Sequence, residues 1–182
     1  GLGVIPRVVS NSRAIYRGKL TLDEATTRLD QYWRPYHTRL QSLLSAAQVS
    51  FGQAILIDCH SMPREALDGT FRTGQKRPEI IIGDRFGASA SRYIVDCIQD
   101  ILTEAGFTVS RNMPFAGAYI TQHYGRPSQR QHAVQFEIDR SLYMDEATLR
   151  PHAGFAQLCD QLDPVVAKLA DLGRARDRLA AE

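Results

Sequence analysis

The sequence feature that most constrains this fold is the stretch Ala54–Met62, which reads AILIDCHSM. Its first half is apolar and rich in β-branched residues, and its second half carries an acid, a thiol and an imidazole. A short apolar run of this kind is typical of a buried strand in an α/β sheet, with its last residues at the carboxyl edge. Ligand sites of such sheets lie at that edge. The stretch therefore predicts an α/β domain with a candidate site directly after this strand.

Asp58 and His60 are the two chemically distinctive residues of this strand. They are two positions apart, so in extended geometry both side chains point to the same side and the carboxylate can orient the imidazole. A metal-bound histidine needs such an acceptor behind its second nitrogen. On spacing alone, a capping acid beside a hydrogen-bonded surface histidine is the commoner arrangement. Both interpretations stay open at this point.

The rest of the chain alternates between helical and strand patterns. Thr21 and Glu24 form a capping box that predicts a helix with an apolar stripe to about residue 48, which Pro35 should kink or divide near Trp33. Further strands are predicted at 79–82, 107–111 and 133–138, and further helices from Ser89 as cap to about Ala105, stopped by Gly106, and over about 152–172. This alternation predicts one layered α/β domain over residues 1–182, with a parallel or mixed sheet.

Composition excludes several classes of protein. The 182 residues contain no apolar run near the roughly 20 residues of a membrane span, so we expect a cytoplasmic protein without a membrane partner. A net charge of only +2 gives no electrostatic case for nucleic acid. The three cysteines are widely spaced and odd in number, which argues against a disulfide framework and against a zinc ribbon.

Polar residues close several of the predicted strands, and we expect them at one edge of the sheet. They are Asp58 and His60, Asp84 and Arg85, Asn112, and Glu137 and Arg140. Glu137 lies between the apolar Phe136 and Ile138, where partial burial would raise its pKa, as suits a general base. The alternative is a glutamate of the sheet face paired with an arginine such as Arg140.

Four blocks together resemble the N-formylglutamate amidohydrolases. They are DCHSM at 58–62, GQKRPEIIIGD at 74–84, NMPF at 112–115 and HAVQFEIDRSLYM at 132–144. Their order and spacing fit that family, and the resemblance covers the chain from about Val4 to Met144. Each block alone is a weak signal, and the combination is specific.

The resemblance implies a three-layer α/β/α sandwich with a mixed sheet, of the phosphorylase/hydrolase-like kind, in a zinc-dependent carboxypeptidase-like hydrolase. It implies hydrolysis of N-formylglutamate to formate and glutamate in histidine degradation. It also implies one Zn²⁺ per chain, with His60 as a metal ligand and Asp58 behind it. Glu137 would be the carboxylate that activates the water held by the metal.

The expected substrate is a small dicarboxylate, which needs cationic or hydrogen-bonding groups at two places. The candidates are Arg126 and Arg140 as first choices, then Arg85, Asn112 and Tyr119. Which of them contact substrate is left open. Two other functions also stay open: a related deacylase of N-acyl amino acids, and a non-catalytic relative that binds an acidic ligand.

One departure from the family concerns the metal ligands. Family members carry an N-terminal section with a Pro-His-Ser-Gly block, expected to supply another zinc ligand, and this sequence has no equivalent. A catalytic zinc takes three protein ligands. His123 and His132 are possible substitutes. We expect instead that the chain is a piece of the enzyme and that residues before Gly1 complete the site.

Overall fold

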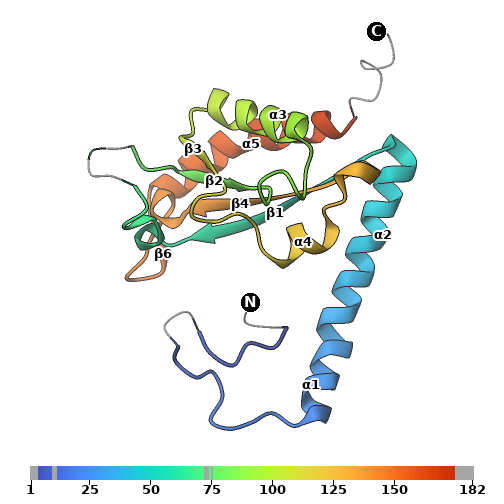
Figure 1. Ribbon diagram of the computed structural model, residues 1–182. Helices are drawn as coiled ribbons and strands as arrows, with labels where there is room; N and C mark the ends of the chain where they lie inside the picture. The colour runs from blue at the N-terminus through green and yellow to red at the C-terminus, as the bar shows by residue number, and fades with distance from the viewer. Residues whose placement is uncertain (1–3, 10–11, 72–73, 75, 175–182) are drawn as a thin grey trace. The chain divides into compact units, whose positions relative to one another are not determined.

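The computed structural model describes residues 4–9, 12–71, 74 and 76–174 (Figure 1). The chain divides into two compact units, residues 1–43 and 44–182. The single domain expected over 1–182 stays a prediction. Among the described residues, no helix combines the length and the apolarity that crossing a bilayer requires.

The first unit contains helix α1, Leu22–Arg28, and the start of helix α2, Arg34–Phe51. The predicted capping box is present: the Thr21 hydroxyl accepts a hydrogen bond from the Glu24 amide at 3.2 Å, and the Glu24 carboxylate accepts one from the Thr21 amide at 3.0 Å. Between the two helices, residues Leu29–Trp33 form a π-helical turn. Pro35 follows it, and since proline has no N–H for the regular helical bond, the turn confirms the predicted interruption near Trp33.

The second unit is built on a four-stranded mixed sheet in the order β1-β4-β2-β3. The strands are β1 Ala54–Met62, β4 Gln131–Asp139, β2 Ile80–Gly83 and β3 Val109–Arg111. β1 runs parallel to β4, and β2 runs parallel to β3. β2 and β4, however, are antiparallel. A small ribbon of β5, Met144–Asp145, and β6, Arg150–Pro151, follows the sheet.

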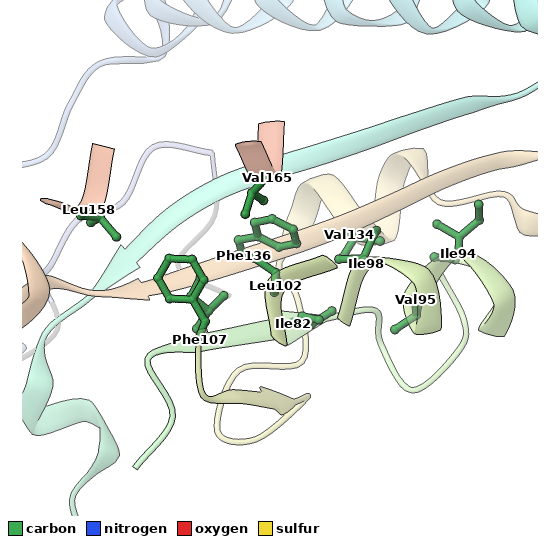
Figure 2. Packing of buried hydrophobic residues seen from close by; sticks show 12 residues of the cluster. Ile82, Ile94, Val95, Ile98, Leu102, Phe107, Val134, Phe136, Leu158 and Val165 are labelled. Atoms are coloured by element: carbon green, nitrogen blue, oxygen red, sulfur yellow. The ribbon is translucent and has the colours of Figure 1, made fainter. Parts of the chain in front are cut away.

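Helices cover both faces of this sheet. Figure 1 shows α3, Arg92–Glu104, and α5, Gly154–Arg174, on one face and the short α4, Tyr119–Tyr124, on the other. The main core fills the space under α3 and α5 (Figure 2), and it contains Ile82, Val134 and Phe136 of the sheet with Ile98 and Val165 of the helices. Burial of these apolar side chains is the main force that holds the helices on the sheet. The α/β class and the mixed sheet are thereby confirmed.

The boundaries of α3 differ in one respect from the sequence-based expectation. The helix begins at Arg92 with Ser91 as its N-cap residue, so the assignment of Ser89 as the cap is wrong. The Ser89 hydroxyl instead donates to the carbonyl of Ala133 on β4 at 2.8 Å. At the other end, Gly106 adopts φ +93°, a left-handed conformation that suits glycine, which confirms the predicted stop.

Candidate active site

His60 and Glu137 are register partners on the parallel strands β1 and β4. Neighbouring strands lie about 4.8 Å apart, and side chains of register partners point to the same face. That face is opposite to α3 and α5, because Phe136 and Ile138, which flank Glu137, pack toward those helices. The imidazole and the carboxylate therefore lie side by side near the carboxyl ends of two parallel strands.

Asp58 fixes the orientation of the His60 ring. Its Oδ2 lies 3.0 Å from His60 Nε2, and the His60 side chain is 45% exposed while that of Asp58 is 16% exposed. A carboxylate oxygen only accepts, so Nε2 carries the proton of this bond. In the neutral imidazole, Nδ1 then bears the lone pair that can bind a cation. This arrangement matches a metal-ligating histidine held by an acceptor behind it.

Glu137 lies in a largely buried environment at the same face, with only 8% of its surface exposed. Burial raises the pKa of Glu137 above the ordinary value of a glutamate, and three neighbours limit that rise: the His60 charge, a hydrogen bond from Gln135 and the Arg140 charge. The Gln135 amide donates through Nε2 to Glu137 Oε1 at 2.8 Å. A buried carboxyl with a raised pKa, beside a histidine that could bind a metal, suits proton transfer.

Arg140 joins the ends of β1 and β4. Its Nε donates to the Ser61 hydroxyl and its Nη2 to the Ser61 carbonyl, both at 3.1 Å. The guanidinium thus bonds to Ser61, whereas the hydrogen bond of Glu137 comes from Gln135. The hydrogen bonds therefore do not show the alternative arrangement, in which Glu137 would pair with Arg140 on the sheet face.

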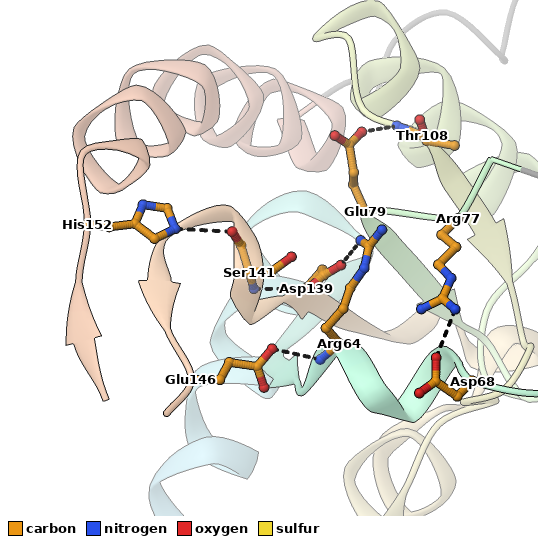
Figure 3. A network of polar contacts seen from close by, with 9 residues as sticks. All are labelled: Arg64, Asp68, Arg77, Glu79, Thr108, Asp139, Ser141, Glu146 and His152. Atoms are coloured by element: carbon orange, nitrogen blue, oxygen red, sulfur yellow. Dashed lines mark hydrogen bonds and ion pairs between the residues drawn. The ribbon is translucent and has the colours of Figure 1, made fainter. Parts of the chain in front are cut away.

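A polar network around the buried Asp139 fixes the end of β4 just beyond Glu137 (Figure 3). Asp139 is fully buried, and its carboxylate accepts from the Arg64 guanidinium and from the Ser141 amide. Arg64 in turn donates its backbone N–H to Glu146 at 2.9 Å. Since buried charges are stable only when they are paired, this network specifies where the strand ends and so where Glu137 lies.

The expectation that all the strand-end groups share one edge is wrong. Because β2 is antiparallel to β4, its carboxyl end lies toward the amino end of β4, and Gly83 is the register partner of Gln135. Asp84 and Arg85 follow at a level about 10 Å or more from Glu137 along β4. The Asn112 amide lies with them: its Nδ2 donates to Asp84 Oδ1 at 2.5 Å and its Oδ1 accepts from the Asp84 amide at 3.0 Å.

The two other substrate-binding candidates lie on or after α4. Arg126 bridges to Gln131 at the amino end of β4, six residues before Glu137, which corresponds to about 20 Å of strand. Its guanidinium donates to the carbonyls of Gln122 and Gly125 at 3.1 and 2.6 Å. Tyr119 opens α4 directly after Ala118, and its ring stacks on that of His123. Of the five candidates, Arg140 is therefore the one placed at the strand ends that carry His60 and Glu137.

Among the described residues, His60 could supply one ligand of a metal site. In the described part of the chain, no three His, Cys, Asp or Glu side chains are grouped to hold a metal ion. His132 cannot bind the same metal as His60, because its side chain lies on the face of β4 opposite to that of Glu137. There its Nδ1 accepts a hydrogen bond from the Ser91 amide at 3.2 Å. His123 belongs to the aromatic stack on α4. His60 with Asp58 thus fits a single ligand position of a zinc centre, and the described residues do not contain the full set.

The family model of N-formylglutamate amidohydrolase matches residues 1–144, which include His60, Glu137 and Arg140. The chain belongs to the N-formylglutamate amidohydrolase family. This match confirms the resemblance seen in the four sequence blocks.

Four known proteins are similar to most of this chain in sequence or in fold. The N-formylglutamate deformylase of Pseudomonas aeruginosa is 31% identical over 98% of the chain, and that of Pseudomonas putida is 34% identical over 79%. The crystal structure of N-formylglutamate amidohydrolase from Ralstonia eutropha JMP134 superposes with a TM-score of 0.81 at 34% identity over 94% of the chain. A gene product of Agrobacterium tumefaciens, 18% identical, shares the fold with a TM-score of 0.59 over 94% of the chain. The chain spans 67%, 54%, 61% and 64% of the lengths of these four proteins, respectively.

Sequence reasoning missed two residues of the site. Gln135 contacts Glu137 directly, and the period-2 spacing of the two residues on one strand was the signal that could have revealed it. Gly83 is the second: a Cβ there would lie 2.7 Å from the Gly117 nitrogen, so only glycine lets the loop 115–118 pack onto β2. No sequence signal indicated that contact, because Gly83 and Gly117 lie on different segments.

An apolar groove of the second unit lies on the other face of the sheet. Its volume is about 610 Å³, and it is lined by Ile57 and Cys59 of β1, by Phe136 of β4 and by Val165 and Leu169 of α5. Cys59 alternates with Asp58 and His60 along the strand, so its thiol points away from them. We therefore assign Cys59 no part in the candidate active site.

Proposed function

We propose that this chain carries the catalytic face of an amidohydrolase that cleaves N-formyl-L-glutamate to formate and L-glutamate. The observation that carries the proposal is the register pairing of His60 with Glu137 on parallel strands. Membership of the family and the names of its Pseudomonas and Ralstonia relatives support the choice of substrate. The same proposal places the reaction in histidine degradation and the protein in the cytoplasm.

In the proposed reaction, Glu137 acts as general base and then as general acid. Its carboxylate takes a proton from the attacking water and passes it to the departing glutamate nitrogen, so that the C–N bond breaks and formate is released. Zinc, when bound with His60 as one ligand, would polarise the formyl carbonyl and acidify water. Asp58 holds the His60 ring with Nδ1 available throughout.

For substrate binding, Arg140 is the leading candidate because of its position at the strand ends. A guanidinium can recognise a carboxylate through two parallel hydrogen bonds, which suits a dicarboxylate substrate. Tyr119, Arg85 and Arg126 remain proposals for the second carboxylate. For Asn112 we propose a structural role, because its amide already forms hydrogen bonds with Asp84 at the start of the next loop.

The test is formate release by the purified full-length protein, loaded with Zn²⁺, from N-formyl-L-glutamate and from a panel of other N-acyl amino acids. We expect activity on N-formylglutamate that a chelator abolishes and added Zn²⁺ restores. Activity on other acyl groups alone would indicate a related deacylase. Stoichiometric binding of glutamate or N-formylglutamate without turnover and without metal would indicate a non-catalytic ligand-binding relative, and either result would refute the proposal.

A further inference from the structure

Gln135 contacts both the proposed base, Glu137, and the loop 115–118 on the same face of the sheet. It lies on β4 two residues before Glu137, and it is only 3% exposed. Its Nε2 donates to Glu137 Oε1 at 2.8 Å, and its Oε1 accepts from the Ala118 amide, also at 2.8 Å. Both ends of the amide are therefore used in one chain of hydrogen bonds.

The direction of this chain follows from the backbone. The Ala118 amide can only donate, so the carboxamide oxygen of Gln135 must face it. The NH₂ group must then face Glu137, and it can only donate. One oxygen of the Glu137 carboxylate, Oε1, is thereby committed to Gln135. The other oxygen, Oε2, takes no part in this chain of hydrogen bonds.

The loop that supplies the Ala118 donor is itself held firmly. Its backbone packs against Gly83 so closely that a Cβ at that position would lie 2.8 Å from the Ala116 carbonyl carbon. The Ala118 carbonyl accepts from the Thr121 hydroxyl at 2.8 Å at the start of α4. The anchor of the hydrogen-bond chain is therefore backbone that is fixed by packing and not a mobile side chain.

We propose that Gln135 is a positioning residue that holds Glu137 with Oε1 bound and Oε2 presented to the reacting water, and that it ties this orientation to the loop 115–118. The inference rests on the proposed role of Glu137 as base. It assigns Gln135 no contact with substrate. We therefore expect substitution of Gln135 to lower kcat and to leave substrate affinity nearly unchanged.

Two variants test the positioning of the base, one that keeps an acceptor for the loop and one that removes it. Gln135→Glu keeps an oxygen that accepts from Ala118 and replaces the neutral NH₂ donor by an acid that competes with Glu137 for a proton, whereas Gln135→Met removes both groups. For each we expect kcat to fall about tenfold or more with KM within about threefold of the wild type. Gln131→Met is the matched control: Gln131 is a buried glutamine of the same strand whose Nε2 donates to the Tyr124 carbonyl, far from Glu137. We expect it to keep wild-type kcat.

A spectroscopic measurement makes the test independent of activity. In metal-free protein labelled with ¹³C-glutamate, the carboxylate stretch of Glu137 is identified as the band lost in Glu137→Gln. We expect Gln135→Met to shift this band, because one oxygen loses its donor, and Gln131→Met to leave it in place. An unshifted band, or a Gln135→Glu variant with wild-type kcat, would overturn the proposal. A shifted band in a protein that releases no formate would refute the proposed function and leave the positioning role standing.

Discussion

His60 and Glu137 lie side by side as register partners on two adjacent parallel strands. Each is held by a second residue two positions earlier on its own strand. Asp58 orients His60 on β1, and Gln135 orients Glu137 on β4. Asp58 is also the register partner of Gln135. Four side chains therefore lie together on one sheet face. Asp58 and Gln135 position His60 and Glu137, respectively.

The first prediction concerns the base. Glu137→Gln should lower kcat for formate release by about 10²- to 10⁴-fold, because an amide cannot take the proton from water. The measurement is steady-state formate release at saturating substrate. Glu104→Gln is the control, since Glu104 is an exposed carboxylate that pairs with Lys168 on α5 and should not affect turnover. A Glu137→Gln variant with wild-type kcat would remove Glu137 from the mechanism.

The second prediction concerns the metal. His60→Ala should lose bound Zn²⁺ while the thermal unfolding temperature changes little, because the half-exposed ring lies near the end of β1 and outside the core. Asp58→Asn should keep the metal but bind it about 10- to 100-fold more weakly, since a neutral amide holds the ring less well than a carboxylate. Metal content by mass spectrometry and a competitive chelator titration measure both. Equal zinc affinity in His60→Ala and wild type would contradict the assignment.

The third prediction concerns the loop packed on β2. Gly83→Ala should reduce the free energy of unfolding by about 1–3 kcal/mol, because the new methyl group would meet the backbone of Ala116 and Gly117, which cannot rotate away. Gly18→Ala is the matched control, as nothing lies within 4 Å of a Cβ there. Urea denaturation at one pH gives both values. A Gly83→Ala variant as stable as Gly18→Ala would show that the loop does not pack as closely as described.

The fourth prediction is a pH dependence of stability. Burial, with a smaller contribution from the Arg130 charge, lowers the pKa of His132 below its ordinary value of 6.5. Below pH 6.5 the unfolded chain therefore binds a proton that the folded chain resists, so acidification through this range favours unfolding. Only the neutral ring can accept, through Nδ1, the hydrogen bond from the Ser91 amide at the start of α3.

The check on this prediction is urea denaturation of wild type and His132→Gln at about pH 7.5 and about pH 5.5. Glutamine offers an oxygen to Ser91 but does not titrate. We expect the variant to lose less unfolding free energy than the wild type between the two conditions. Equal losses would mean that His132 does not contribute to the pH dependence.

Local sequence determined the elements and several of their boundaries. The capping box at Thr21 and Glu24, the interruption at Pro35 and the stop at Gly106 could be predicted because each depends on residues only a few positions apart. The strand that begins at Ala54 was predictable for the same reason, although it runs to Met62 and not to the expected end at residue 59. Period 2 along that strand also placed Asp58 and His60 on one side, which the structure shows.

Only the tertiary structure decided which strand ends meet. Nothing in the sequence around Ile80–Gly83 indicates that β2 runs antiparallel to β4, and that direction moved Arg85 and Asn112 away from Glu137. The pairing of His60 with Glu137 likewise joins residues 77 positions apart through the register of two strands. Strand direction and register depend on the burial of whole sheet faces and on long-range backbone pairing, and short-range patterns carry no record of either.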